Sequence, residues 1–199
     1  AGYDVSRLMV GAMGTLGCLL DVSLKVMPKP EHESCVSLDV SRDTLVASLS
    51  SWHRQAAVTG ASFVDGKLLL RFSGSHEEVS RMVSRCAGEV VSGSVFSDLR
   101  DLKFSTSGDL LRLSVAANSR YGLDEAIAVD WAGGIRWLED SGLDFDHLQQ
   151  GHAVQYFGRS ELTERYSPLS SGLQNIHLKL KQEFDSTSLF NYQRLYGAW

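Results

Sequence analysis

The sequence predicts an α+β fold in which helices pack on one face of one or more antiparallel sheets. Segments in which apolar and polar residues alternate with a period of two come between amphipathic segments of helical period. Their order over the first half is strand, helix, hairpin, helix, strand, which is the β-α-β-β-α-β unit of a ferredoxin-like fold. The 199 residues, 43% hydrophobic and 22% charged, are enough for one large domain or two small ones.

The first predicted strand covers residues 19–27, where apolar and polar side chains alternate. Pro28 and Pro30 end it, because neither residue can donate a hydrogen bond to a neighbouring strand. They are two of the three prolines in the chain and mark the predicted domain boundary. We therefore expect residues 1–30 to close a preceding domain and residues 31–199 to form one α+β domain.

The ferredoxin-like unit follows this boundary. Asp65 and Gly66 stand between two apolar runs and predict the turn of a hairpin. Ser75 is placed to cap the second helix, and Gly88 to end it. The predicted elements are a strand at 35–40, a helix from about 42 to 57, hairpin strands at 61–64 and 67–72, a helix at 76–87 and a strand at 89–91.

A second, less regular copy of this unit is predicted after it. Its elements are strands at 110–116 and 152–157, a hairpin of 126–131 and 135–138 around the turn 132–134, a helix at 145–150 and a final amphipathic helix at about 169–184. Lys179 and Lys181 lie near the end of that last helix, where a positive charge suits the helix dipole, so no partner is assigned to them.

Composition excludes several classes of function. The 19 Lys and Arg against 24 Asp and Glu leave a net charge of −5, which argues against a general nucleic-acid binder. No apolar run is long enough for a transmembrane helix. Three widely spaced cysteines do not make a disulfide framework, and we interpret them as reduced, buried thiols of a cytoplasmic protein.

Candidate chemical groups outside the glycines are few. The six histidines show no metal-ligand spacing, so no metal site is predicted, and no nucleophile motif is present. His152 could face a substrate, although a hydrogen-bonded histidine at the start of a strand is the favoured interpretation. Arg136, beside Trp131 and Trp137, could clamp a carboxylate substrate or make a cation–π contact, but its place in a hairpin favours packing in the sheet.

The densest motif is the glycine-rich run of residues 11–17, Gly-Ala-Met-Gly-Thr-Leu-Gly. Glycines at this density let a backbone approach a flat ligand or a phosphate closely. The run is neither a Walker loop, since no Lys-Ser/Thr follows, nor a Rossmann fingerprint, since a predicted strand rather than a helix follows it. When the glycine-rich run is considered without its neighbours, a tight turn is the favoured interpretation.

The residues around this run resemble a known family. Residues 3–17 and 22–30 are similar to the end of the FAD-binding domain in FAD-linked oxidases of the vanillyl-alcohol-oxidase type, most of all in the E subunits of bacterial glycolate oxidases. Residues 129–138, the Gly-His-Ala at 151–153 and residues 180–196 also resemble segments of those subunits, in the same order. The matches extend over the whole chain.

The resemblance implies contact with a flavin. In this family the Gly-Thr-Leu-Gly loop lies against the FAD, and a tail of pattern Phe-Asp-Pro-x-Gly-x-Phe-Asn-Pro-Gly-Arg brings an asparagine to the flavin side. The matching positions are Gly11, Gly14, Thr15, Leu16, Gly17 and Asn191. The tail departs from the pattern at Ser186, at Ser188 and at Tyr192-Gln193, where the family has Pro, Gly and Pro-Gly.

The resemblance also implies a function. Residues 1–30 correspond to the end of the FAD-binding domain and 31–199 to the C-terminal domain with its helix and flavin-side tail. The implied activity is hydride transfer from a small 2-hydroxy acid to FAD, in a complex with a sister flavoprotein subunit and an iron–sulfur subunit that is cytoplasmic or peripheral at the inner membrane. Because the family's upstream phosphate-binding loop is not in this chain, we expect the isolated chain to bind FAD weakly or not at all and to be inactive.

Two other classes of function remain open. The chain could be a non-catalytic assembly module that docks on the sister flavoprotein or the iron–sulfur subunit. It could also be a small-molecule-binding regulatory domain, an interpretation that rests on fold analogy alone.

Overall fold

The computed structural model describes residues 4–139, 148, 151–158 and 165–197, which form two compact units. One unit comprises Ala1–Met27 and Arg159–Trp199, and the other comprises Pro28–Gly158. The first division falls at the predicted proline boundary. The last 41 residues, which we expected to belong to the α+β domain, are grouped with the N-terminal segment instead. The two units are described separately below.

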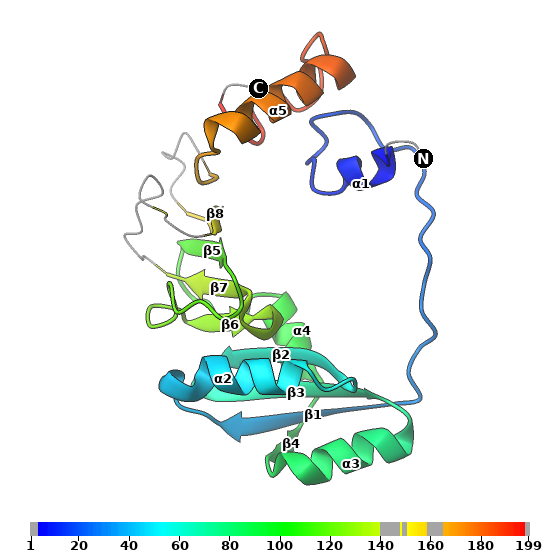
Figure 1. Ribbon diagram of the computed structural model, residues 1–199, viewed down its shortest axis with the longest axis vertical. Helices are drawn as coiled ribbons and strands as arrows, with labels where there is room; N and C mark the ends of the chain where they lie inside the picture. Colours follow the sequence, from blue (N-terminus) through cyan, green and yellow to red (C-terminus); the bar gives the residue numbers. More distant parts are fainter. Residues whose placement is uncertain (1–3, 140–147, 149–150, 159–164, 198–199) are drawn as a thin grey trace. The chain divides into compact units, whose positions relative to one another are not determined.

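The second unit contains one eight-stranded sheet with the order β4-β1-β3-β2-β6-β7-β5-β8 (Figure 1). All its neighbouring strands are antiparallel. The order β4-β1-β3-β2 is that of a ferredoxin-like unit, so the predicted fold class is confirmed. The strands are β1 His32–Asp39, β2 Val58–Val64, β3 Lys67–Gly74, β4 Glu89–Val91, β5 Leu110–Ser114, β6 Ala128–Asp130, β7 Ile135–Leu138 and β8 His152–Phe157.

Local sequence features account for the structure of the ferredoxin-like half of the sheet, strands β1 to β4. Asp65 and Gly66 both have positive φ, at 51° and 77°, which is the geometry of a two-residue hairpin turn. The Ser75 hydroxyl accepts a hydrogen bond from the backbone N–H of Glu78 at 3.3 Å and caps α3, His76–Cys86. Gly88 does not end this helix by a left-handed turn, since Ala87 takes that conformation. A Cβ atom at position 88 would instead lie 2.6 Å from a backbone oxygen of β1, so glycine is required for close packing.

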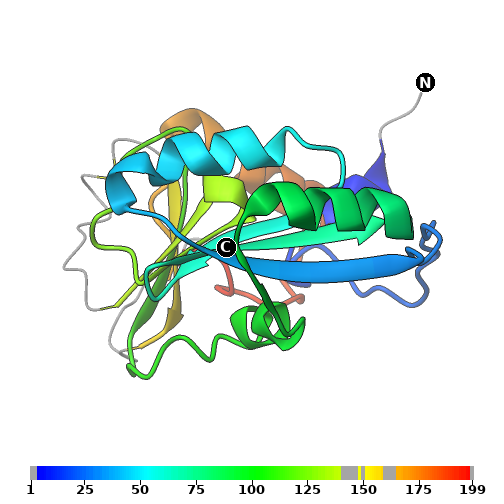
Figure 2. The ribbon, with the colours of Figure 1, turned by 90° about the horizontal axis from the view of Figure 1, so that it is seen from below.

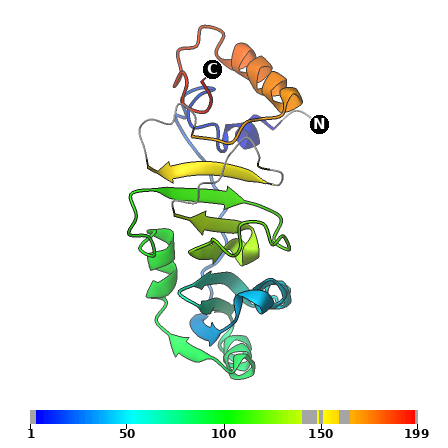
Figure 3. The same ribbon diagram turned by 90° about the vertical axis from the view of Figure 1, so that its left-hand side faces the viewer.

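Helices cover both faces of the sheet. Helix α2, Arg42–His53, and α3 lie on one side, and the short helix α4, Ser94–Arg100, lies on the other (Figures 2 and 3). The core under α2 and α3 includes Leu45, Leu49, Phe63, Phe72 and Val79, all at most 2% exposed. Helix α4, which the sequence did not predict, places Phe96 against Gly60 and under the guanidinium of Arg71.

The second half does not form a second copy of the unit, because its strands extend the same sheet. Strand β6 pairs with the outer strand β2 of the ferredoxin-like half, with Phe63 opposite Val129. The predicted hairpin is confirmed as β6 and β7, joined through the 3₁₀ turn Trp131–Gly133. The helix predicted at 145–150 lies outside the described residues except for Leu148.

The strand predicted at residues 19–27 is wrong. This segment pairs with no strand of the described residues, and its apolar side chains are exposed; Leu20 is 94% exposed and Val26 81%. Alternation gives a segment the faces of a strand, but a strand also needs a partner for its backbone groups.

The first unit contains two helices among its described residues. Helix α1, Val5–Met9, is capped by Asp4, whose carboxylate accepts from the N–H of Arg7. Helix α5, Ser171–Phe184, is capped by Ser170 and confirms the predicted final helix. The apolar face expected for this helix is not its buried one, since Leu173 and Ile176 are about half exposed; its other members are Leu180 and Phe184. The side chain of Lys181 is buried instead.

Candidate functional site

The glycine loop, defined as residues 11–17, is a series of tight turns in the first unit. The N–H of Ala12 donates to the carbonyl of Met9, and that of Thr15 donates to the carbonyl of Ala12 at 2.9 Å. Gly11 and Gly14 have φ values of 81° and 71°, which glycine adopts without strain. Thr15 is fully buried, and its hydroxyl also donates to the carbonyl of Ala12 at 2.7 Å.

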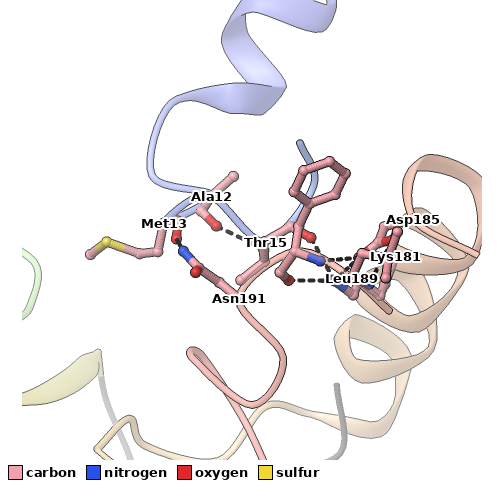
Figure 4. Close-up of polar contacts among 8 residues, drawn as sticks. Ala12, Met13, Thr15, Lys181, Asp185, Leu189 and Asn191 are labelled. Atoms are coloured by element: carbon pink, nitrogen blue, oxygen red, sulfur yellow. Dashed lines mark hydrogen bonds and ion pairs between the residues drawn. The ribbon is translucent and has the colours of Figure 1, made fainter. Parts of the chain in front are cut away.

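Lys181 joins three segments of this unit. Its Nζ donates to the carbonyl of Thr15 at 2.7 Å, to the carboxylate of Asp185 at 2.6 Å and to the carbonyl of Phe190 at 2.8 Å (Figure 4). The side chains of Lys181 and Asp185 are only 5% and 2% exposed. The loop, the end of α5 and the tail that follows it therefore meet at one ammonium group.

Asp185 organises the tail, defined as residues 185–194. Its two carboxylate oxygens accept hydrogen bonds from the backbone N–H groups of Leu189 and Phe190, at 2.9 and 2.8 Å. Burial raises the pKa of this carboxyl, but the hydrogen bonds from Lys181, Phe190 and Leu189 outweigh burial and hold the pKa at about 2. The carboxylate is therefore ionised at neutral pH.

Asn191 lies on the glycine loop. Its Nδ2 donates to the carbonyl of Met13 at 2.8 Å, and a Cβ atom at position 14 would lie 2.8 Å from the same nitrogen. Gly14 is thus required by both its φ and its contact. The structure brings together the two motifs that the resemblance marks as flavin contacts, although they are far apart in the sequence.

The tail backbone takes left-handed conformations at two positions where the sequence departs from the family pattern. Ser188 and Gln193 stand at the two glycine positions of that pattern, and both have left-handed φ values, 53° and 59°. The backbone therefore adopts the conformation that glycine would favour, with a serine and a glutamine in place.

A small apolar cavity of about 160 Å³ lies between the loop and α5. It is lined by Leu8, Val10, Gly11, Ala12, Thr15, Leu16, His177, Leu180 and Leu195. Three of the five loop positions marked as flavin contacts therefore border one hollow.

Arg136 and His152 lie in the other unit and are not brought together. Arg136 is opposite Leu113, whereas His152 is opposite Ser114, so the two side chains point to opposite faces of the sheet. Arg136 has no exposed surface, and its guanidinium donates to the carbonyls of Gly133 and Ser119. Burial lowers its pKa. These contacts support the packing interpretation.

His152 begins β8 after Gly151, as predicted. Burial and the nearby charge of Arg112 lower the pKa of its imidazole, which favours the neutral form. Gly151 has a φ of 91°, and a Cβ atom there would lie 2.1 Å from the carbonyl oxygen of Ser114. The glycine is therefore needed for strand pairing beside the histidine.

Sequence reasoning missed the role of Lys181. We assigned it to the helix dipole, but the structure gives it three buried acceptors. A signal was present, since Asp185 stands four residues later, the spacing at which oppositely charged side chains meet on a helix. Nothing in the sequence identifies Thr15 and Phe190 as the other two partners.

The described part of the chain holds no cluster of three or more His, Cys, Asp or Glu side chains placed to bind a metal ion. Within the same residues, every helix is too short or too polar to cross a membrane.

The resemblance to FAD-linked oxidases that the sequence motifs predict is confirmed by comparison with known proteins. Glycolate oxidase subunit GlcE of Escherichia coli (strain K12) is 32% identical to this chain over 207 aligned residues. The alignment covers 99% of the chain but 58% of that subunit, so the chain spans less than two thirds of its relative. No protein-family model and no solved structure matches the chain.

Proposed function

We propose that this chain is the C-terminal part of a flavin-binding subunit of a glycolate or other 2-hydroxy-acid oxidase. When bound, FAD would supply the redox chemistry by accepting a hydride from the substrate. The observation that carries the proposal is the hydrogen bond from Asn191 to the Met13 carbonyl, which places one matched position, Asn191, against another, Gly14.

The flavin contacts in this proposal are the five loop positions and Asn191. Gly14 is exposed and has no side chain, so a flat ring can approach its backbone closely. The amide of Asn191 uses one N–H on Met13, and its other N–H and its oxygen have no hydrogen bond to the described residues. These groups suit the polar edge of a flavin ring.

This site is incomplete for the diphosphate of FAD. Lys181 is the buried cation beside the loop, but its ammonium group already has three acceptors. A diphosphate needs a converging set of backbone N–H donors or free cations, and one glycine loop is a weak substitute for such a set. We therefore expect the isolated chain to bind FAD more weakly than micromolar affinity and to be inactive. A sub-micromolar dissociation constant in a fluorescence titration of this chain would contradict that expectation.

Residues 1–30 belong, in the same proposal, to the end of an FAD-binding domain. Their support is the exposed alternating segment 19–27, in which Leu20, Leu24 and Val26 are at least 79% exposed. Exposed apolar side chains in such a segment suit a surface that another part of the native subunit covers. Amide exchange at residues 19–27 should be fast in this chain and slow in the native flavin-loaded subunit; equally fast exchange in both would contradict this assignment.

The second candidate is an assembly module that docks on a sister flavoprotein or an iron–sulfur subunit. One observation favours it. The outer strand β8 exposes Tyr156 and Phe157 by 47% and 52%, and apolar side chains at a sheet edge are typical of protein contacts.

One substitution separates the two candidates. Asn191→Ala in the native subunit should abolish FAD loading if the loop and tail contact the flavin, and Gly14→Ala should do the same. Gln174→Ala, at an exposed position of α5, is the matched control and should leave loading unchanged. Intact loading in both loop–tail variants, measured by flavin absorbance per mole of protein, would favour the assembly module.

A further inference from the structure

We propose that Lys181 and Asp185 are positioning residues, which orient peptide groups of the glycine loop so that two N–H groups are presented to a hydrogen-bond acceptor on the bound flavin. The inference rests on the proposed function for the identity of the ligand. It assigns a role to a buried ion pair of which Lys181 was expected only to suit the helix dipole.

The Lys181–Asp185 ion pair binds backbone groups of the protein rather than a ligand. An ammonium group has three N–H donors, and Lys181 uses them on Thr15, Asp185 and Phe190. Burying two charges is costly and is offset only when their remaining hydrogen-bonding groups are satisfied. Here the partners of the pair are mainly backbone atoms of the loop and the tail, so Lys181 acts through those segments.

The orientation of the loop follows from peptide geometry. In a trans peptide the C=O and the N–H point in opposite directions, and the described residues contain no cis peptide. Lys181 holds the carbonyl of Thr15, so the N–H of Leu16 in the same peptide group points away from Lys181. This N–H has no hydrogen-bond acceptor among the described residues.

The peptide group that joins Met13 to Gly14 is held in the same way. Asn191 holds the carbonyl of Met13, so the N–H of Gly14 points away from Asn191. It too has no acceptor within the described part of the chain. The N–H groups of Gly14 and Leu16, two residues apart, belong to the two loop peptide groups whose carbonyls are held from outside the loop, and are thus oriented for an acceptor atom such as a ring carbonyl oxygen or a ring nitrogen.

Asp185 links the two peptide groups. It binds the N–H groups of Leu189 and Phe190, the two residues before Asn191, and so fixes where Asn191 meets the loop. Lys181 binds Asp185 and also the carbonyl of Phe190. Loss of the pair should therefore disturb the Met13 contact as well as the Thr15 contact, although neither charged side chain touches Met13.

The first experiment needs no ligand and uses this chain. The backbone carbonyl ¹³C shifts of Met13 and Thr15 report their hydrogen bonds. Lys181→Met, which keeps the length of the side chain and removes its donors, should move both shifts. Lys179→Met, at an exposed position on the same helix, should move neither. An unmoved Met13 carbonyl in Lys181→Met would overturn the positioning role.

A double variant separates positioning from mere stability. Lys181→Met alone leaves an unpaired buried carboxylate, whereas Lys181→Met/Asp185→Asn leaves no buried charge and should recover thermal stability. If the pair positions the loop, the two carbonyl shifts stay displaced in the double variant. If they return to their original values as stability returns, the positioning role is refuted. The double variant also serves if the single variant does not fold.

The flavin part is tested separately in the native subunit. Lys181→Met/Asp185→Asn should lower FAD affinity about tenfold, the scale of one hydrogen bond, and change the visible absorption of the bound flavin. An unchanged affinity and spectrum would overturn the link between the pair and the ligand. A native subunit that loads no FAD would refute the proposed function, whereas the ligand-free carbonyl shifts would still decide the positioning role.

Discussion

Substituting Gly151 by alanine should destabilise the sheet unit by about 2–4 kcal/mol. The φ of 91° at this residue costs a side-chain-bearing residue about 1–2 kcal/mol. The added Cβ would lie 2.1 Å from the carbonyl oxygen of Ser114, far inside the 3.4 Å at which ordinary contact begins. Because that oxygen is backbone of β5, the clash is relieved only if β5 and β8 separate locally.

The local separation of β5 and β8 accounts for the rest of the destabilisation. Loss of about two hydrogen bonds between β5 and β8 costs about 1 kcal/mol each. The lower entropy of an unfolded chain with alanine offsets about 0.4–1 kcal/mol. The free energy of unfolding should be measured by urea titration followed through the fluorescence of Trp137, which is buried beside this strand pair on β7.

The matched control is Gly108→Ala. A Cβ atom at position 108 would have nothing within 4 Å, so this variant should stay within about 0.5 kcal/mol of the unaltered chain. A loss below about 1 kcal/mol for Gly151→Ala would refute the reasoning, because backbone strain alone accounts for that much. A comparable loss in both variants would show that the effect is not specific to the close approach at Ser114.

Three further predictions concern the tail and the cysteines. Ser188→Gly and Gln193→Gly should each raise the free energy of unfolding by about 0.5–1 kcal/mol, and with it the thermal unfolding midpoint, because both sites have left-handed φ; lower midpoints would contradict the assigned backbone. The interpretation of all three cysteines as buried is wrong for Cys18, which is exposed. Cys18 should react with a thiol reagent in the folded chain, whereas Cys86, whose pKa burial raises to about 11, should react only after unfolding; equal rates by mass spectrometry would argue against this burial. The pKa of Asp185 is about 2 in the folded chain and about 3.9 in the unfolded chain. The stabilisation from its carboxylate should therefore be complete above about pH 3.9 and be lost as the pH falls through about 2. Loss of the tail's amide signals already at about pH 5 would refute this prediction.

Local chemistry made much of the first half predictable. The turn at Asp65 and Gly66, the cap at Ser75 and the order of the elements each depend on residues close together in the sequence, and the ferredoxin-like half of the sheet follows from them. The glycine loop and Asn191 were identified through the resemblance to a family, since neither spacing nor composition connects two segments so far apart.

The pairing of strands that are far apart in the sequence could not be predicted from such patterns. The strand at residues 19–27 was predicted from alternation that the structure leaves unpaired, while strand β6 found its partner in β2, where Phe63 meets Val129. Alternation specifies which side chains share a face, but it carries no information on which strand supplies the hydrogen bonds. This is why a second unit was expected where the chain extends one sheet.

By itself, then, the sequence determined the class of fold and the boundary at the prolines, and its resemblance to a family singled out the glycine loop and Asn191. Only the tertiary structure decided that these motifs touch, that Lys181 is buried among three acceptors, and that Arg136 and His152 face opposite sides of the sheet. The physical reason is that caps, turns and periodicity act over a few residues, whereas a buried charge is tolerated only where distant backbone groups converge on it.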